Sequence, residues 1–353
     1  MSVTTDFNEG NIQSIETEEK QQLIKCTFEL YVLDMNQTYS DTHPCFELYN
    51  ATYIFLHNPS ILCVFLYIVI SCLCLATVCG NLLVIISIVY FKQLHIPTNY
   101  LILSLAVADL LVGVVVFPFS MAQTLTSCLY QENVFCKIRA WFDITLSTSS
   151  ILNLCCISID RYYAICKPLT YKNIVTGRVA GFMIFMTWSV AAMIGSSILI
   201  EGNNQEACTE PCLDVVLTNI TGSIFAFFMP AVIMICIYLK IFFVAQRQRS
   251  SIQISKCGTI SKTERKATKT LAIVMGVFLL CMTPYFLCIV FLPLTSETPP
   301  FSLIEALNWL TLSNSMLNPF IYAFFYSWFR SACKMIVFGQ IFKSNLASTK
   351  LMG

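Results

Sequence analysis

Polar and ionisable side chains interrupt several long apolar stretches of this sequence, and their types suggest ion or ligand chemistry. The side chains in question are Asn81, Asp109, Asp143, Asp160, Arg161, Asn314, Ser315 and Asn318. Charged groups in hydrocarbon are costly, so they mark ligand sites, ion sites or switches by default. Their other role is to join helices through hydrogen bonds. The set as a whole is too particular for that role alone.

Asp143 has the most definite chemical requirement of this set. It lies a few turns from the outer end of its apolar stretch, and the apolar stretches offer no obvious lysine to neutralise it. A carboxylate that is removed from water needs a compensating charge nearby. The sequence therefore predicts that Asp143 binds a cation.

The composition around these polar groups argues against a water-soluble fold. The chain has 353 residues, of which 56% are hydrophobic and 12% are charged, and its mean hydropathy is +0.70. Soluble proteins carry about 25% charged residues. The formal net charge of +1 also argues against nucleic acid as the main partner.

Seven apolar runs are long enough to cross about 30 Å of hydrocarbon. They are Ile61–Phe91, Tyr100–Leu125, Val134–Ile165, Val179–Ile200, Val215–Val244, Thr270–Leu294 and Phe301–Phe325. One such run could be a buried core helix, but seven in series, joined by polar loops, favour a membrane bundle. We predict an all-α membrane protein, a seven-transmembrane helix bundle with a short amphipathic eighth helix.

The distribution of basic residues predicts the orientation of this bundle. The segment between the fifth and sixth runs is basic, whereas the loop after the fourth run is acidic and has no lysine or arginine. This pattern places the N-terminus outside the plasma membrane and the C-terminus in the cytosol. We expect an extracellular tail over residues 1–60, the transmembrane domain over 61–338 and a cytoplasmic tail over 339–353. Asn36 and Asn50 begin glycosylation sequons on the outer side.

Several of the eighteen cysteines fall on the predicted outer side, in a compartment where disulfides form. They are Cys26, Cys45, Cys128, Cys136, Cys208 and Cys212. Spacing alone does not determine which of them pair.

Short motifs at fixed places along the runs carry a resemblance to a known family. These motifs are GNLLV with Asn81, LAVAD ending at Asp109, DRY at Asp160–Tyr162, Trp188, Pro230 and NPFIY at Asn318–Tyr322. Over Ile61 to Phe338 the chain resembles the rhodopsin-class G protein-coupled receptors. The pattern N-S-x-x-N-P-x-x-Y-x-x-x-Y-x-W-F, which begins at Asn314, is similar to the trace amine-associated receptors in particular.

The resemblance implies an ion site and an activation switch. Asp109, Ser150, Asn314 and Asn318 would surround a water-filled pocket that holds a sodium ion in the resting state, and no other cofactor is expected. Arg161 would pair with Glu264 and separate from it as the sixth run swings outward to admit a G protein. The switch residues expected from the family are Asp160, Arg161, Tyr162, Glu264, Met282, Pro284, Asn318, Pro319 and Tyr322. Met282 departs from the family, which usually has tryptophan there.

The resemblance also implies a ligand. Amine receptors bind a protonated amine at the position of Asp143, and aromatic rings surround the cation. The ligand-binding residues expected are Asp143, Ser147, Ser223, Tyr285, Phe286, Glu305, Trp309 and Leu312. Glu305 lies four residues before Trp309 and so on the same helical face, where it favours a second ammonium. Diamines or polyamines such as cadaverine, putrescine and spermine are therefore predicted ahead of catecholamines.

The family pattern further predicts the disulfides Cys136–Cys212 and Cys45–Cys208, and a stimulatory or olfactory-type G protein that raises cAMP. A chemosensory amine receptor is the leading hypothesis. A receptor for a monoamine, serotonin-like, histamine-like or trace, is the alternative. An opsin is disfavoured because the seventh run lacks lysine, and a transporter or channel because the polar groups form no continuous path. An enzyme is disfavoured because the sequence shows no P-loop, catalytic triad or metal-ligand cluster.

Overall fold

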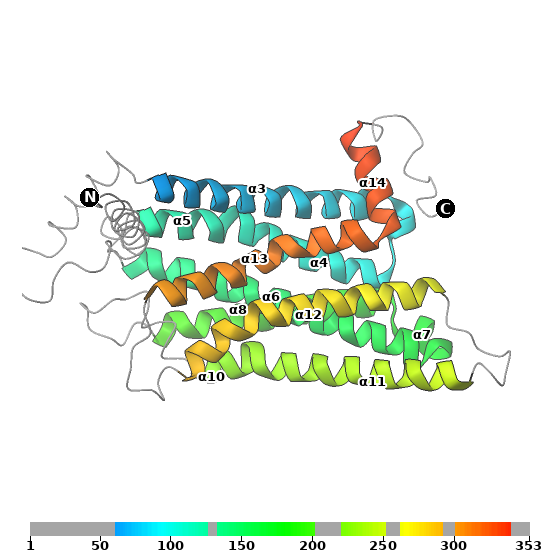
Figure 1. Ribbon diagram of the computed structural model, residues 1–353. Coiled ribbons are helices and arrows are strands. Elements are labelled where there is room, and N and C mark those ends of the chain that lie inside the picture. Colours follow the sequence, from blue (N-terminus) through cyan, green and yellow to red (C-terminus); the bar gives the residue numbers. More distant parts are fainter. Residues whose placement is uncertain (1–60, 126–132, 202–219, 252–261, 292–300, 340–353) are drawn as a thin grey trace, which may run out of the picture.

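The computed structural model describes residues 61–125, 133–201, 220–251, 262–291 and 301–339, and that part of the chain is helical (Figure 1). The long helices are α3 (Ile61–Tyr90), α4 (Pro97–Leu111), α5 (Phe117–Leu125), α6 (Asn133–Cys166), α8 (Gly177–Glu201), α11 (Met229–Ser251), α12 (Lys262–Phe291) and α13 (Phe301–Phe325). The shorter elements are η1 (Lys92–Leu94), α7 (Pro168–Ile174), α10 (Ile220–Ser223) and α14 (Ser327–Val337). Two π-helical turns, η2 (Val112–Val116) and η3 (Ile224–Phe228), join α4 to α5 and α10 to α11.

α4, η2 and α5 form one continuous rod, and successive rods of the bundle run in opposite directions along one common axis (Figure 1). α6 lies at the centre, since it packs against α4, α8, α11 and α12. The bundle closes where α13 packs against α3 and α12. α6 therefore presents its side chains to four neighbours, and both Asp143 and the Asp160–Arg161 pair are on this helix.

Six of the described helical rods are long and apolar enough to cross a membrane. They are Tyr67–Tyr90, Pro97–Met121, Ile138–Cys166, Gly177–Ser197, Ile224–Val244 and Thr270–Phe291. The seventh predicted run forms α13, which has a comparable length of 25 residues. It contains the asparagines and serines that first drew attention in the sequence, and these lower its hydropathy.

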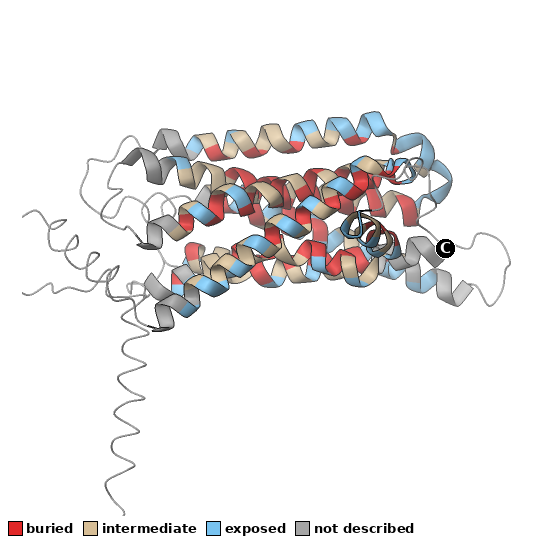
Figure 2. Ribbon diagram, turned by 90° about the horizontal axis from the view of Figure 1, so that it is seen from above, coloured by how far each residue is buried: buried red, intermediate tan, exposed pale blue. Residues whose placement is uncertain are grey.

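The bundle is apolar on the outside and partly polar on the inside, which is the pattern expected for lipid as the solvent. Figure 2 shows exposed residues on the outward faces of the helices and buried residues on the inward faces. Phe182 is 65% exposed and Phe324 is 76% exposed, whereas Asn81 and Asp109 are fully buried. Backbone polar groups must be satisfied within the segment in lipid, and helices meet that requirement.

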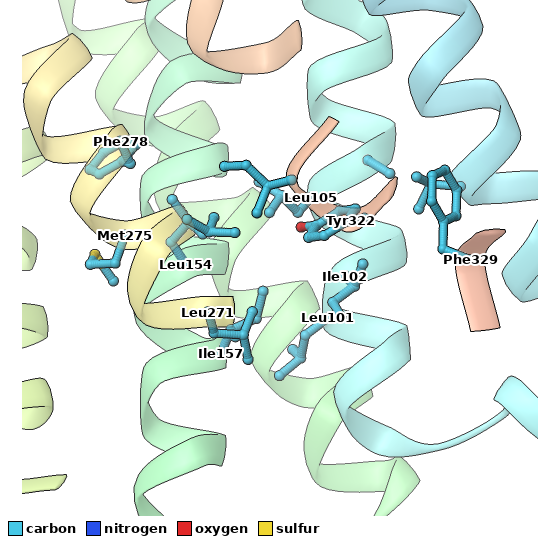
Figure 3. Close-up of a cluster of buried hydrophobic side chains, with 14 of the residues drawn as sticks. Leu101, Ile102, Leu105, Leu154, Ile157, Leu271, Met275, Phe278, Tyr322 and Phe329 are labelled. Atoms are coloured by element: carbon cyan, nitrogen blue, oxygen red, sulfur yellow. The ribbon is translucent and has the colours of Figure 1, made fainter. Parts of the chain in front are cut away.

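One half of the bundle has a continuous apolar core (Figure 3). Tyr322 of α13 lies beside Leu105 of α4, with Leu154 of α6 and Leu271 of α12 in the same cluster. Phe329 of α14 also belongs to it, so α14 is held to the bundle by apolar contacts. These residues come from five helices between α4 and α14. The core therefore fixes the end of α13 that carries the NPFIY motif.

Pro319 lies inside α13 and Pro284 lies inside α12. A proline removes one backbone hydrogen bond and crowds the preceding turn, so it loosens the helix locally. Gly80 of α3 faces the Pro319 ring, and a Cβ at Gly80 would lie 2.9 Å from the Pro319 Cβ. Glycine is therefore required for the close approach of α3 to the proline of α13.

Some predicted boundaries and sites differ or lie outside the described residues. The sixth apolar run begins at Thr270 as predicted. α12 extends beyond it, back to Lys262, because the preceding residues are rich in Lys, Arg, Glu and Ala, which are good helix formers. Helix is described from Ile220 onward in the fifth run, and residues 215–219 are outside the described part. The predicted disulfide and glycosylation residues Cys45, Cys208, Cys212, Asn36 and Asn50 are outside it too, as is the side chain of Cys136.

Candidate functional site

The Asp143 carboxylate lies inside the bundle on α6, and a hydroxyl one turn further along the helix contacts it. Ser147 Oγ donates to Asp143 Oδ1 at 3.4 Å. Tyr285 of α12 is close enough to interact electrostatically with Asp143. The structure thus brings together Asp143, Ser147 and Tyr285 from the predicted ligand-binding set.

The other predicted aromatic residues belong to two separate clusters of rings. Phe286 of α12 stacks on Phe227 of η3, with ring centroids 4.3 Å apart and an interplanar angle of 3°. Trp309 of α13 packs against Phe117 of α5 at 5.7 Å. Leu312 is buried in the same small cluster as Phe117. The rings therefore line different walls of the bundle, one formed by α12 with η3 and the other by α13 with α5.

Two further predicted residues, Ser223 and Glu305, are placed only in part. Ser223 is buried at the end of α10, next to the π-helical turn. Glu305 lies on α13, one turn before Trp309, but its side chain is outside the described part. Its expected role therefore stays a prediction.

Arg139 is a charged residue near Asp143 that the sequence analysis missed. Arg139 is four residues before Asp143 on α6, and residues at this spacing lie on one helical face. It interacts electrostatically with both Asp143 and Tyr285. Its Nε donates to Ser120 Oγ of α5 at 3.2 Å. The sequence prediction considered only lysine as a partner of Asp143 and found none. The i, i+4 spacing of Arg139 and Asp143 in RAWFD is the signal that indicates an arginine instead.

Asp109 of α4 is at the centre of a second polar group, in the middle of the bundle. Ser150 Oγ donates to Asp109 Oδ1 at 3.1 Å, and Asn318 Nδ2 donates to Asp109 Oδ2 at 2.8 Å. Asn314 is 1% exposed, and neither polar atom of its side chain has a hydrogen-bond partner among the described residues. The four residues of the predicted ion site come from α4, α6 and α13.

Asn81 links this polar group to α3. Its Nδ2 donates to the backbone oxygen of Ser315 at 3.0 Å and to that of Thr77 at 2.9 Å. The Ser315 contact joins helices that are 234 residues apart in sequence. Asn81 therefore joins α3 to α13 through a hydrogen bond, which is the structural role open to a buried polar residue in a membrane bundle.

The Asp160–Arg161 pair forms a third charged group near the other end of α6. Arg161 Nε donates to Asp160 Oδ2 at 2.8 Å, and Arg161 Nη2 contacts the same oxygen. Two hydroxyl groups complete the set: Thr98 Oγ1 donates to Asp160 Oδ2 at 2.8 Å, and Tyr171 OH donates to Asp160 Oδ1 at 2.8 Å. Thr98 and Tyr171 were not expected from the sequence, since both lie outside α6, Thr98 on α4 and Tyr171 on the short α7.

The expected partner of Arg161, Glu264, lies on α12, but its side chain is outside the described part. Tyr162 faces α11, where Lys240 Nζ lies 5.3 Å from its ring centroid. In the described structure Arg161 is thus held by Asp160, and its pairing with Glu264 stays a prediction.

Met282 lies in the apolar core at the position where the family usually has a tryptophan. It is 3% exposed and packs in the cluster that includes Phe227 and Phe278, whose rings are 6.2 Å apart. Met fills irregular gaps well because its side chain is unbranched and flexible. The aromatic residues that share this apolar cluster with Met282 include Phe227 and Phe278.

The chain belongs to the rhodopsin family of seven-transmembrane receptors, since residues 80–322 match the family described as 7 transmembrane receptor (rhodopsin family). It is 44% identical to trace amine-associated receptor 1 of Macaca mulatta over 309 residues, which are 81% of this chain and 91% of that receptor. It is 40% identical to trace amine-associated receptor 4 of Mus musculus over 328 residues, or 87% of this chain and 94% of the relative. These relatives place it among the trace amine-associated receptors, which are receptors and not enzymes.

The Asp160 cluster yields a prediction for Tyr171. Burial, together with the negative charge of Asp160, raises the pKa of Tyr171, so its hydroxyl stays protonated and donates at neutral pH. Tyr171→Phe removes a hydrogen bond to a charged group, worth about 1.5–3 kcal/mol. We expect a lower melting temperature of the purified receptor and higher signalling without agonist.

A matched control is Tyr100→Phe, because the Tyr100 hydroxyl makes no hydrogen bond among the described residues. If Tyr171→Phe and Tyr100→Phe give the same melting temperature and basal signal as the unmodified receptor, Tyr171 does not hold Asp160 in the resting state.

Proposed function

We propose that this chain is a receptor for protonated amines that acts through a heterotrimeric G protein. The observation that carries the proposal is Asp143: a half-buried carboxylate on α6 with a serine hydroxyl beside it and Tyr285 of α12 near enough to interact with its charge. An alkyl amine, with a pKa near 10.4, reaches the site as a cation. The relatives are named for trace amines, and their similarity extends over most of the chain.

We also propose that the receptor is in the plasma membrane. The charge distribution supports an orientation with the N-terminus outside the cell and the C-terminus in the cytosol. The segment between α11 and α12 is basic, and the one between α8 and α10 is acidic. α14 fits the expected amphipathic eighth helix: Trp328 and Phe329 are buried, while Arg330 and Lys334 are exposed. On this basis we infer that α14 lies along the cytosolic surface. The resemblance to the trace amine-associated receptors, and not this geometry, suggests a G protein of the stimulatory or olfactory type.

The proposal extends to diamines and polyamines as ligands. Glu305 is one turn before Trp309 on α13, so both are on the helical face that also contains Leu312. Trp309 packs against α5 and Leu312 is buried beside it, which turns this face inward. A second carboxylate there would hold the far ammonium of cadaverine, putrescine or spermine. A monoamine ligand is the alternative, and it would need only Asp143.

The mid-bundle polar group fits a resting-state sodium ion. Hard cations bind oxygen ligands, and the group offers the Asp109 carboxylate, the Ser150 hydroxyl and the carbonyl of Asn314, whose side chain has no partner. Sodium would supply a positive charge to a carboxylate that is otherwise buried without a cation. Asp109, Ser150, Asn314 and Asn318 would hold it.

The amine proposal is tested by Asp143→Asn, which keeps the shape of the side chain and removes its charge. Truncating one partner of a buried charge pair costs about 2–5 kcal/mol, so amine potency in a cAMP assay should fall by more than tenfold. Surface expression, measured with an antibody to an N-terminal tag, should remain. Ser147→Ala should cause a smaller loss, because its hydroxyl contact is long. Full amine potency in Asp143→Asn would rule out this anchor.

The diamine proposal is tested by Glu305→Gln with cadaverine and n-pentylamine as a matched pair of agonists. We expect the substitution to weaken cadaverine by more than tenfold and to leave n-pentylamine within a few-fold of its original potency. The reason is that only cadaverine carries a second ammonium. Equal shifts for both compounds, or no response to cadaverine in the unmodified receptor, would favour the monoamine alternative.

The sodium proposal is tested by the melting temperature of the purified receptor without agonist. A ligand that binds only the folded state raises its stability, so replacing potassium by sodium at constant ionic strength should raise the melting temperature. Asp109→Asn should abolish that difference, while Asp143→Asn, which also removes a bundle carboxylate, should retain it. The same sodium effect in Asp109→Asn and in the unmodified receptor would exclude this site.

A further inference from the structure

Arg139 is placed between the predicted amine anchor and α5. It lies one helical turn outward from Asp143 on α6 and is half-buried. The hydrogen bond from Nε to Ser120 Oγ, at 3.2 Å, holds the guanidinium toward α5. Ser120 is itself 4% exposed, so this contact is inside the bundle and not on its rim. The arginine is therefore directed across the bundle and fixed there.

The two terminal nitrogens of Arg139 have no hydrogen-bond partner among the described residues, and no ion pair joins Arg139 to Asp143 there. A guanidinium has five N–H donors in a fixed fork, and only Nε is engaged by Ser120. The opposite charges nonetheless interact at longer range. In the described part of the chain the carboxylate and the guanidinium are thus not paired directly, and each is hydrogen-bonded to a serine hydroxyl.

This arrangement is complementary to a molecule with one positive and one negative end. Asp143 accepts from an ammonium, and the free fork of Arg139 matches a carboxylate, which guanidinium groups bind through two parallel hydrogen bonds. We propose that the receptor binds zwitterionic amines, with the ammonium at Asp143 and the anionic group at Arg139. This inference rests on the proposed amine site and adds the charge at the other end of the ligand.

The spacing of Arg139 and Asp143 determines how far apart the two charged ends of such a ligand must be. Four residues along a helix correspond to about 6 Å, and the Arg139 side chain is hydrogen-bonded to Ser120 on α5 and not to Asp143 among the described residues. The two charges of the ligand must therefore be several bonds apart. An ω-amino acid with a short methylene chain meets this requirement better than an α-amino acid, whose charged groups are on adjacent atoms.

Arg139 also affects the diamines. A second ammonium that extends toward α5 would meet the positive charge of Arg139, whereas one that extends toward Glu305 on α13 would not. Because like charges at close range are unfavourable, Arg139 acts as a specificity residue in two ways. It attracts an anionic end on the α5 side and directs a cationic end away from that side.

The test uses three probes of similar length with different far ends: n-pentylamine, cadaverine and 5-aminopentanoate. Each is measured on the full-length receptor by its effect on the melting temperature, which detects binding without signalling, and by the cAMP response. The variants are Arg139→Gln, which removes the charge, and Arg139→Lys, which keeps the charge and loses the fork. Ser120→Ala releases the guanidinium without changing the charge.

We expect 5-aminopentanoate to bind the unmodified receptor and to lose at least tenfold in affinity in Arg139→Gln. Arg139→Lys and Ser120→Ala should lose less. In Arg139→Gln, n-pentylamine should change by no more than a few-fold and cadaverine should bind as well or better.

Two results would overturn the proposal. In one, n-pentylamine binds in an Asp143-dependent manner but 5-aminopentanoate does not bind, which refutes the zwitterion and leaves the amine site intact. In the other, Arg139→Gln shifts all three probes equally, which makes Arg139 only an internal counter-charge to Asp143. If n-pentylamine and cadaverine bind equally well to Asp143→Asn, the amine site itself is wrong, whatever the behaviour of Arg139.

Discussion

The burial of the Asp109 carboxylate in the middle of the bundle is the constraint on which much of the structure depends. Lipid offers no hydrogen bonds, so the cost of this group is met only by side chains from other helices. Ser150 of α6 and Asn318 of α13 each donate to one of its oxygens. Those contacts require α4, α6 and α13 to meet at one depth. Gly80 against Pro319 and Asn81 against the Ser315 backbone bring α3 to the same place.

The same reasoning explains why a proline and two asparagines are tolerated in α13. Pro319 leaves a backbone carbonyl without its usual donor, and Asn318 and Asn314 are buried polar groups. In a helix that faced lipid these features would be destabilising. In α13 they face inward, where Asn318 is paired with Asp109 and the apolar core around Tyr322 holds the helix end. Asn314 keeps unpaired polar atoms, which makes it the member of the group best able to bind an ion or water.

Much of this architecture could be predicted from the sequence, because hydropathy fixes the number and approximate limits of membrane helices. The motifs also identified Asp109 and the Asp160–Arg161 pair, and Asp143 was identified as an ionisable residue inside an apolar run. Contacts between helices were harder to predict. Thr98 and Tyr171 are 62 and 11 residues from Asp160, and no periodicity relates them to it. The proximity of Arg139 to Asp143 could have been predicted from their i, i+4 spacing, but only lysine was considered as a partner. The π-helical turns η2 and η3 could not be predicted, since their residues are ordinary helix and strand formers.

The three charged groups of the bundle share one physical design: hydroxyl groups, and not opposite charges alone, determine where each charge lies. Ser147 contacts Asp143, Ser120 contacts Arg139, Ser150 contacts Asp109, and Thr98 with Tyr171 contacts Asp160. A direct ion pair between Arg139 and Asp143 would neutralise both groups and leave less for a ligand to gain. Held apart by serines, each retains unfilled hydrogen-bonding capacity and long-range attraction for a counter-charge. A ligand that supplies such charges gains more binding free energy than it would at a neutralised pair. Its binding would then contact groups held by α5, α6 and α12 together.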